Sequence, residues 1–392
     1  MTSAKLLRTR ADFLNATGVL LVVRDPPLAN PPTPGQPVAV PANPAEGVEI
    51  LLSIWQDGTV IALHGHVDLG TGIQTAFAQI VAEELDVAVE QVEVILGDTG
   101  IVPNQGPTIA SGSIQIHAAP LRAAAAQARK YLLELAASHL GVPRGQLTIN
   151  AGVVSASGLD ATTATSVSYA QLVAAQRIHL QLDLTTLTKD PATYRVVGQS
   201  TPRVDIPAKA TGELVFVHDM RLPGMLHGRV IRPPYAGADH GDFIGNLLES
   251  VDETSIAHIP GIRAVVVIRD FIGIVAEREE LAELAANTLR VTWKPWEGLP
   301  DTSDIAQALR ANPATPRQLV DDGDVDQAIA QAAQSMPRTY IWPYQMHASI
   351  GPSCAVAHFK ADAADPFSLT VWAGTQNPHV LRADLALSLI HI

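Results

Sequence analysis

The amino-acid sequence predicts an α+β protein of two or three domains, and three observations predict this fold class. The chain has 392 residues, enough for more than one buried core. Hydrophobic residues make up 47% of it and charged residues only 17%, which is typical of packed domains. Short alternating runs typical of strands are followed by longer runs with helical periodicity.

Charge and cysteine content exclude several classes of protein. The net charge of −13 argues against nonspecific nucleic-acid binding, because that binding needs clustered Lys and Arg. The single cysteine, Cys354, excludes an internal disulfide and any zinc or iron–sulfur cage built from cysteines of this chain, and its small apolar neighbours predict a buried, inert thiol. The apolar run at 18–23 is shorter than the roughly 20 residues of a membrane span. With no adjacent arginines near the N-terminus, we expect a cytoplasmic location, with a periplasmic one as the alternative.

The first expected domain spans residues 48–187 and follows an N-terminal extension at 1–47 that carries a proline-rich strap. Strand-like runs at 48–54 and 59–66 flank Gln56-Asp57-Gly58, which predicts a hairpin. A glycine loop, Gly70-Thr71-Gly72, comes next. The helical run that follows it places Ile73, Phe77 and Val81 on one apolar face.

This order of strand, glycine loop and helix predicts a site for an anionic group, because the start of a helix carries unpaired N–H donors and a positive dipole end. A nicotinamide-binding Rossmann domain is one competing interpretation. It is disfavoured, since Thr75 stands where the dinucleotide fingerprint has its third glycine, and since a hairpin precedes the loop.

A second strand, loop and helix follow at 91–96, 97–112 and 114–140, and Gly141 is the expected helix stop. The second loop is also made of small residues, so we expect both loops to converge on one ligand. His64 and His66 lie two apart on a strand and face the same side, as two ligands of a metal would. No third ligand has the right spacing, which favours histidines that satisfy hydrogen bonds.

Four segments follow the first domain. Residues 188–204 resemble a linker, and 205–297 are expected to form a compact α+β unit. Its strands are predicted at 214–217, 226–231, 264–268, 272–276 and 289–293, and its helix at 279–287. Residues 298–338 are expected to be an acidic helical connector with Asp321, Asp322, Asp324 and Asp326 on a solvated face. A new β-rich unit begins at 339.

Three motif sets resemble the xanthine dehydrogenase and aldehyde oxidase superfamily. The first is similar to its second molybdopterin-binding domain, the middle one to its α/β hammerhead domain, and the last to the opening of its first molybdopterin-binding domain. Their order resembles large subunits of the isoquinoline 1-oxidoreductase and nicotinate dehydrogenase type. The motifs are Asp57-Gly58-Thr59-Val60, Gly70-Thr71-Gly72-Ile73-Gln74-Thr75 and Pro107-Thr108-Ile109-Ala110-Ser111-Gly112-Ser113, then Pro207-Ala208-Lys209-Ala210-Thr211-Gly212-Glu213, Leu222-Pro223-Gly224-Met225-Leu226-His227 and Arg232-Pro233-Pro234, then residues 347–357 with Thr375-Gln376-Asn377-Pro378.

The resemblance implies an oxidoreductase that hydroxylates an aromatic N-heterocycle, nicotinate- or isoquinoline-like, with water as the oxygen source. An aldehyde is the alternative substrate. It implies a molybdenum–molybdopterin cofactor in its cytosine dinucleotide form, a small partner subunit with [2Fe-2S] clusters and a cytochrome c as a candidate acceptor. Carried over by residue, the cofactor-binding positions are Gly70, Thr71, Gly72, Thr108, Ala110, Ser111 and Ser113.

Two departures from the family pattern bear on these positions. The family commonly has glutamine at Thr71, and xanthine-type enzymes have Glu-Pro at Gly351-Pro352, which argues for a substrate other than xanthine. The family's glycine-rich segment and general-base glutamate are expected beyond residue 386. We therefore expect a C-terminally truncated chain that is inactive by itself. A noncatalytic scaffold that binds a pterin or another protein chain is the rival hypothesis.

Overall fold

The computed structural model describes residues 8–26, 47–156, 166–233, 247–295, 301–343, 345, 348–360 and 368–390. The chain forms two compact units. The first consists of Met1–His218 together with Cys354–Ile392, and the second of Asp219–Ser353. Both contain helices and strands, so the α+β class is confirmed.

A five-stranded mixed sheet is the centre of the first unit, with the strand order β4-β3-β2-β1-β8. The three inner strands pair antiparallel, and each outer strand pairs parallel with its neighbour. The expected hairpin is confirmed, because the Trp55 N–H donates to the Thr59 carbonyl at 2.9 Å. The strands are β1 (Val19–Arg24), β2 (Glu49–Trp55), β3 (Val60–His64), β4 (Val92–Leu96) and β8 (Arg177–Gln181).

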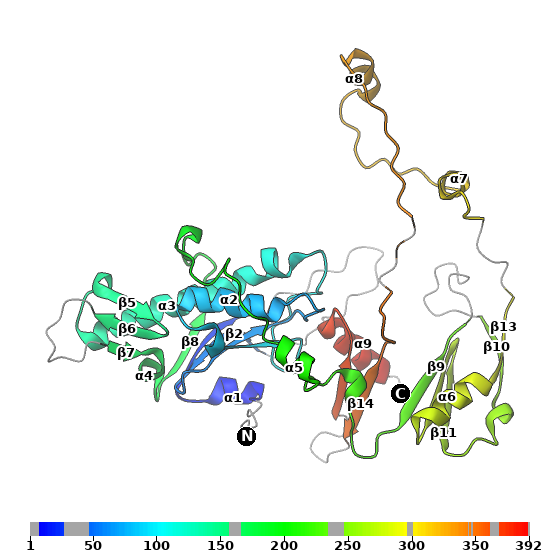
Figure 1. Cartoon of the computed structure of the whole chain (residues 1–392), viewed down its shortest axis with the longest axis horizontal. Helices are drawn as coiled ribbons and strands as arrows, with labels where there is room; N and C mark the ends of the chain where they lie inside the picture. Colours follow the sequence, from blue (N-terminus) through cyan, green and yellow to red (C-terminus); the bar gives the residue numbers. More distant parts are fainter. Residues whose placement is uncertain are drawn as a thin grey trace. The chain divides into compact units, whose positions relative to one another are not determined.

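Helices cover both faces of this sheet (Figure 1). On one face, α2 (Ile73–Leu85) and α3 (Ala118–Leu140) share a core with the strands, in which Phe77, Val81 and Leu121 are almost fully buried. On the other face lies the short α1 (Arg10–Asn15), whose Phe13 ring meets the Trp55 ring edge-on at 5.6 Å. Two apolar cores, one on each face of the sheet, thus fix the strands and helices that the loops after β3 and β4 connect.

A small antiparallel sheet of β5 (Leu147–Asn150), β6 (Val153–Ala156) and β7 (Ser166–Ser168) adjoins α3. It leads into α4 (Tyr169–Val173), which begins with a capping box between Ser168 and Gln171.

The sheet extends beyond the expected boundary at residue 48. The apolar run at 18–23, which is too short for a membrane span, leads into and largely forms β1. This strand lies between β2 and β8 and is buried except at Arg24. A strand buried on both faces has no polar alternation, which is why the sequence pattern did not reveal it. Part of the expected extension therefore belongs to the first sheet. The proline-rich strap at 27–43 lies outside the described residues.

In the second unit, β9 (His227–Ile231), β11 (Ile262–Ile268) and β12 (Phe271–Ala276) form a sheet against which α6 (Glu279–Thr288) packs. A second pair joins β10 (Leu248–Asp252) to β13 (Arg290–Trp293). Four expected strands and the helix are present, and β10 was not predicted.

The strand expected at 214–217 was wrong. Short helix α5 (Ile206–Thr211) precedes this run and ends at Gly212, whose φ of 74° is left-handed. The Leu214 N–H donates to the Ala208 carbonyl at 3.0 Å, so the run folds back on the helix end and Val217–Asp219 form a 3-10 turn.

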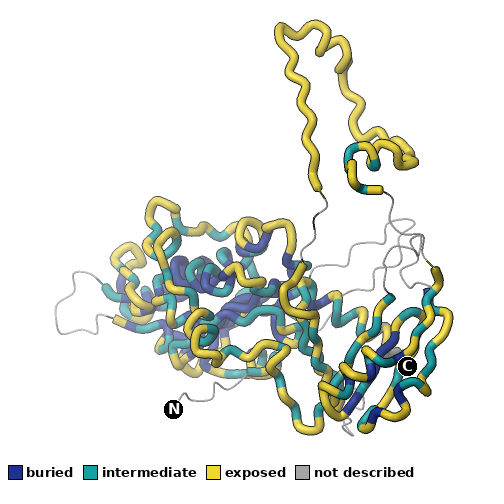
Figure 2. Tube along the Cα trace, turned by 45° about the vertical axis from the view of Figure 1, so that its right-hand side comes forward, coloured by how far each residue is buried: buried dark blue, intermediate teal, exposed yellow. Residues whose placement is uncertain are grey.

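The connector carries two short helices, α7 (Ile305–Ala311) and α8 (Val325–Gln331), and most of its described residues are exposed (Figure 2). Asp324 is not only part of a solvated face, because its carboxylate caps α8 by accepting from the Gln327 N–H at 2.9 Å. Beyond the connector, β14 (Ala355–Lys360) pairs with β15 (Ser368–Ala373), and α9 (Pro378–Ile390) follows. Cys354 is only partly buried, contrary to the expected buried thiol.

Candidate functional site

The glycine loop lies between β3 and α2, and both of its glycines have left-handed backbones, with φ of 92° at Gly70 and 80° at Gly72. Such angles cost little only for glycine. The N–H groups of Gly70, Gly72 and Gln74 all donate to the carboxylate of Asp68, at 2.8, 3.1 and 3.2 Å. An acidic side chain of the protein thus already occupies the start of α2.

This arrangement argues against an anionic group at the start of α2. Three of the N–H donors that would bind phosphate are engaged by Asp68, whose negative charge would also repel it. In the sequence, Asp68 stands two residues before Gly70, and this position could have indicated that a carboxylate of the protein accepts from the N–H groups of the loop.

The second loop also has an unusual backbone. Ala110 and Ser111 each have a φ of 54°, which costs free energy at residues other than glycine. Directly after them, Ser113–His117 form one turn of π-helix ahead of α3. Strained residues and π-turns concentrate at functional sites, although neither identifies a ligand.

The segment between β3 and the glycine loop is hydrogen-bonded to the second loop, while the convergence of both loops on one ligand stays a prediction. The Val67 N–H donates to Thr108 Oγ1 at 3.0 Å, and His66 Nδ1 hydrogen bonds with Ser113 Oγ at 2.8 Å. Gln105 Oε1 also accepts from the Gly65 N–H at 2.9 Å. Three contacts therefore join the end of β3 to the loop before α3.

The seven predicted cofactor-binding residues divide into two groups. Gly72, Thr108 and Ser113 are buried, and both hydroxyls hydrogen bond within the protein, so they support the loops. Exposed positions are Gly70, Thr71, Ala110 and Ser111. The apolar side chains of Leu69 and Ile109 are also exposed next to them. The exposed surface offers hydroxyl and backbone groups beside apolar side chains.

His64 and His66 are both hydrogen-bonded within the protein. His64 Nε2 bonds with the His117 carbonyl at 3.0 Å, and its ring stacks on Phe77 with centroids 4.0 Å apart. Burial lowers the pKa of His64 from 6.5 to about 3, and burial and the neighbouring His117 lower that of His66. Within the described residues, no group of His, Cys, Asp and Glu is arranged to hold a metal ion.

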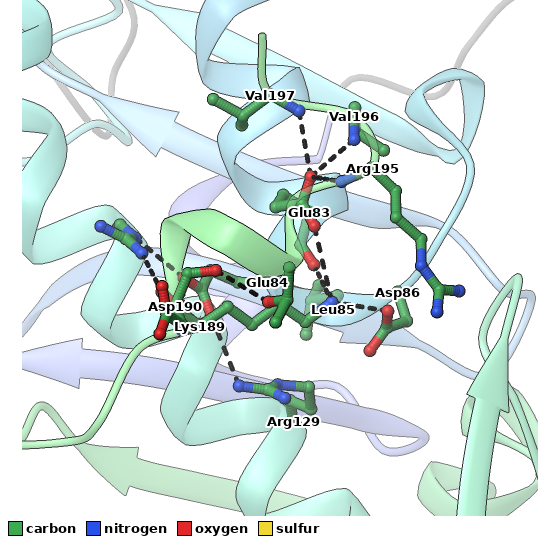
Figure 3. A network of polar contacts seen from close by, with 12 residues as sticks. Glu83, Glu84, Leu85, Asp86, Arg129, Lys189, Asp190, Arg195, Val196 and Val197 are labelled. Carbon is green, nitrogen blue, oxygen red and sulfur yellow. Dashed lines mark hydrogen bonds and ion pairs between the residues drawn. The ribbon is translucent and has the colours of Figure 1, made fainter. Parts of the chain in front are cut away.

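The expected linker at 188–204 packs along α2 (Figure 3). Glu83 accepts from the backbone N–H groups of Arg195, Val196 and Val197 at 2.9, 2.6 and 3.0 Å. Burial acts to raise the pKa of Glu83, but these donors and Lys189 outweigh it and lower the pKa overall. Its neighbour Glu84 is fully buried and accepts from Arg122, Arg129 and the Lys189 N–H.

Sequence reasoning did not reveal the contact made by Gln376, which lies in the loop between β15 and α9. Its side-chain amide donates to the Thr108 carbonyl, and its own carbonyl accepts from the Thr108 N–H, both at 2.8 Å. The motif Thr375-Gln376-Asn377-Pro378 had singled out the residue without its contact. Of the helices in the described ranges, none is long and apolar enough to cross a membrane.

Comparison with known proteins gives two family matches, each described as a molybdopterin cofactor-binding domain. They cover residues 33–211 and 311–390. A nicotinate dehydrogenase subunit of Pseudomonas putida is 54% identical over 98% of this chain and 32% of its own length. The beta chain of isoquinoline 1-oxidoreductase from Brevundimonas diminuta is 27% identical over 87% of this chain and 48% of its own length.

Among solved structures, reconstituted CO dehydrogenase from Oligotropha carboxidovorans matches 39% of this chain and 18% of its own, at 23% identity and a TM-score of 0.28. So low a score supports no structural argument. The chain spans between about a third and a half of the length of these two curated relatives.

Proposed function

The chain belongs to the xanthine dehydrogenase family of molybdopterin cofactor-binding proteins, and on that premise we propose that it carries part of the cofactor site of an enzyme that oxidises an aromatic N-heterocycle. Nicotinate or a close relative is the proposed substrate. The observation that carries the proposal is that the segment leading into the glycine loop is hydrogen-bonded to the second small-residue loop, through Val67–Thr108 and His66–Ser113. The 54% identity to a chain of a nicotinate dehydrogenase supports the choice of substrate.

In this proposal the exposed residues Thr71, Ala110 and Ser111 line the pterin part of the cofactor, while Thr108 and Ser113 hold the loops in place. When bound, the molybdenum cofactor supplies the two-electron oxidation and the oxygen derived from water. The chain's own contribution is to orient the pterin ring and to hold the two loops that line it in a fixed conformation. Since Asp68 occupies the start of α2, the phosphate groups of a cytosine dinucleotide form would bind away from the glycine loop.

Further parts of the proposal come from the family resemblance. The second unit, with α6 packed against β9, β11 and β12, is proposed to be the α/β hammerhead domain. Electrons are proposed to leave through [2Fe-2S] clusters on a small partner subunit, to a cytochrome c, in the cytoplasm or the periplasm. The single cysteine agrees with clusters held by another chain.

The test is to purify the natural gene product with its co-expressed partner and to measure molybdenum, pterin content and nicotinate-dependent reduction of an artificial acceptor. A Thr71→Trp substitution should lower the pterin content, because the larger side chain would block the exposed surface of the glycine loop. Thr315→Trp on the exposed connector should leave the pterin content unchanged. A purified wild-type complex without stoichiometric molybdenum would favour the noncatalytic scaffold. Turnover of aldehydes but not of N-heterocycles would favour the aldehyde-oxidising alternative.

A further inference from the structure

One outer face of α2 is polar and is covered by residues 189–205, a segment that we call the α2 strap. Three α2 residues spaced by four, Thr75, Gln79 and Glu83, hydrogen bond to it. This spacing places their side chains in one row along the helix. The row explains why Thr75 and Glu83 are buried although α2 buries its apolar residues in the core.

The α2 strap runs from the C-terminal end of α2 to its N-terminal end. At the C-terminal end, Lys189 Nζ contacts the Glu83 carbonyl and Asp86 Oδ1, both at 2.5 Å, and Glu83 accepts the three N–H groups described above. In the middle, Gln79 Nε2 donates to the Val196 and Gln199 carbonyls at 3.2 Å each. Near the N-terminal end, the Val204 N–H donates to Thr75 Oγ1 at 3.0 Å.

Arg203 lies on the part of the α2 strap that reaches the glycine loop. Its Nη1 donates to the Gly70 carbonyl at 2.9 Å. A Cβ at Gly72 would lie 3.3 Å from the Arg203 side chain, so the arginine packs against that glycine. Asp205 holds the guanidinium by two hydrogen bonds, at 3.0 and 2.6 Å, and Lys209 shares the same carboxylate. Such a fork fixes the direction of the guanidinium.

We propose that Arg203 is a positioning residue for the glycine loop, and that the α2 strap, anchored at Glu83, holds it in place. Arg203 donates to the Gly70 carbonyl of the glycine loop. The N–H groups of the same loop donate to Asp68. The glycine backbone is therefore fixed by side chains at both its donors and its acceptor, without any ligand. This inference rests on the proposed function only for the identity of the group that the loop receives.

The experiment is hydrogen–deuterium exchange of the full chain, followed on peptides that cover residues 68–76 and 193–199. Arg203→Ala should speed exchange at 68–76 by about tenfold or more and leave 193–199 unchanged, since local opening follows the loss of local contacts. Glu83→Gln keeps the side-chain size but lacks the charge, and should speed exchange in both regions. Arg203→Lys keeps the charge without the fork and should give an intermediate rate at 68–76.

Arg195→Ala is the matched control, because Arg195 lies on the same α2 strap with an exposed side chain and contributes its backbone N–H, which alanine retains. It should exchange like the wild type. Circular dichroism identifies any variant that has simply failed to fold. Wild-type exchange at 68–76 in a folded Arg203→Ala variant would overturn the proposal, as would Glu83→Gln opening the α2 strap without affecting the loop.

Pterin content of the complex with its partner gives a second readout. Arg203→Ala should lower it severalfold while Arg195→Ala leaves it unchanged. If the wild-type complex contains no pterin but the exchange results are as expected, the proposed function fails and the positioning role of Arg203 is supported. An unchanged pterin content in Arg203→Ala would contradict the role of Arg203 in the cofactor site.

Discussion

Thr108 and Gln376 are 268 positions apart and form two hydrogen bonds with each other, both 2.8 Å long. One runs from the Thr108 N–H to the Gln376 carbonyl, and the other from the Gln376 amide to the Thr108 carbonyl. Arg382 adds a third contact, from its Nη1 to the Thr99 carbonyl at 2.9 Å. The C-terminal segment of the first unit is thus attached directly to the second loop of the candidate site.

Replacing Gln376 should loosen that attachment. Gln376→Ala removes one of the two hydrogen bonds and should lower the local opening free energy of residues 105–113 by about 1 kcal/mol. Gln376→Glu should cost more, because a carboxylate would face the Thr108 carbonyl. Hydrogen exchange of peptides from this loop measures both effects. Gln318→Ala, on the exposed connector, is the control, and equal exchange in all three variants would contradict the attachment.

Removing the Asp68 carboxylate should destabilise the start of α2 and create an anion site. Asp68→Ala frees three N–H groups and should cost about 1 kcal/mol, as loss of a helix cap does. Inorganic phosphate should then raise the melting temperature of the variant but not that of the wild type. Asp183→Ala removes a similar turn carboxylate, bonded to Thr185, and should show no phosphate effect. If phosphate raised the melting temperature of the wild type as well, the glycine loop would be shown to bind an anion even with Asp68 present.

His64 makes stability depend on pH. Its pKa is 6.5 when unfolded and about 3 when folded, so between these values the unfolded chain binds more protons. Stability therefore falls as the pH drops from 6.5 towards 3, by at most about 5 kcal/mol. His64→Gln should reduce the slope of unfolding free energy against pH between 4 and 6 by up to about 1.4 kcal/mol per pH unit. An unchanged slope in His64→Gln would mean that His64 titrates alike in both states.

Two glutamates with arginine partners should respond very differently to neutralisation. Glu84 is fully buried between Arg122 and Arg129, so Glu84→Gln leaves both cations poorly compensated and should cost about 3 kcal/mol or more. The side chain of Glu134 is 55% exposed, and its Oε1 lies 4.0 Å from Arg144 Nη1. Glu134→Gln should therefore lower the free energy of unfolding by less than about 0.5 kcal/mol. Urea denaturation followed by the near-ultraviolet signal compares the two. Similar losses would show that Glu84 is solvated in solution.

Gly65 permits a close approach of two backbones. A Cβ there would lie 2.2 Å from the Pro103 carbonyl oxygen, so Gly65→Ala must displace the loop before α3 and should cost about 2 kcal/mol or more. At Gly145 nothing lies within 4 Å of the added Cβ, and Gly145→Ala should be close to neutral. Thermal unfolding of the two variants provides the comparison. A neutral Gly65→Ala would mean that this loop adjusts freely.

Local patterns in the sequence predicted the elements whose signals are short-range. Gln56-Asp57-Gly58 predicted the hairpin and Gly141 the end of α3, because each depends on a few neighbouring residues. Both small-residue loops were found for the same reason. The sequence did not reveal β1 or α5, because a strand buried on both faces lacks alternation and a short helix lacks a measurable period. The partly exposed β10 was not predicted either.

By itself, the sequence determined the family, the α+β class and the positions of the two small-residue loops. Only the tertiary structure decided which groups occupy those loops. Asp68 takes the N–H groups of the glycine loop, Arg203 takes its carbonyl, and Gln376 pairs with Thr108 from the far end of the chain. Hydrogen-bond partners of this kind are chosen by distance in space, and for residues far apart in the chain that distance is set by how the sheet and helices pack.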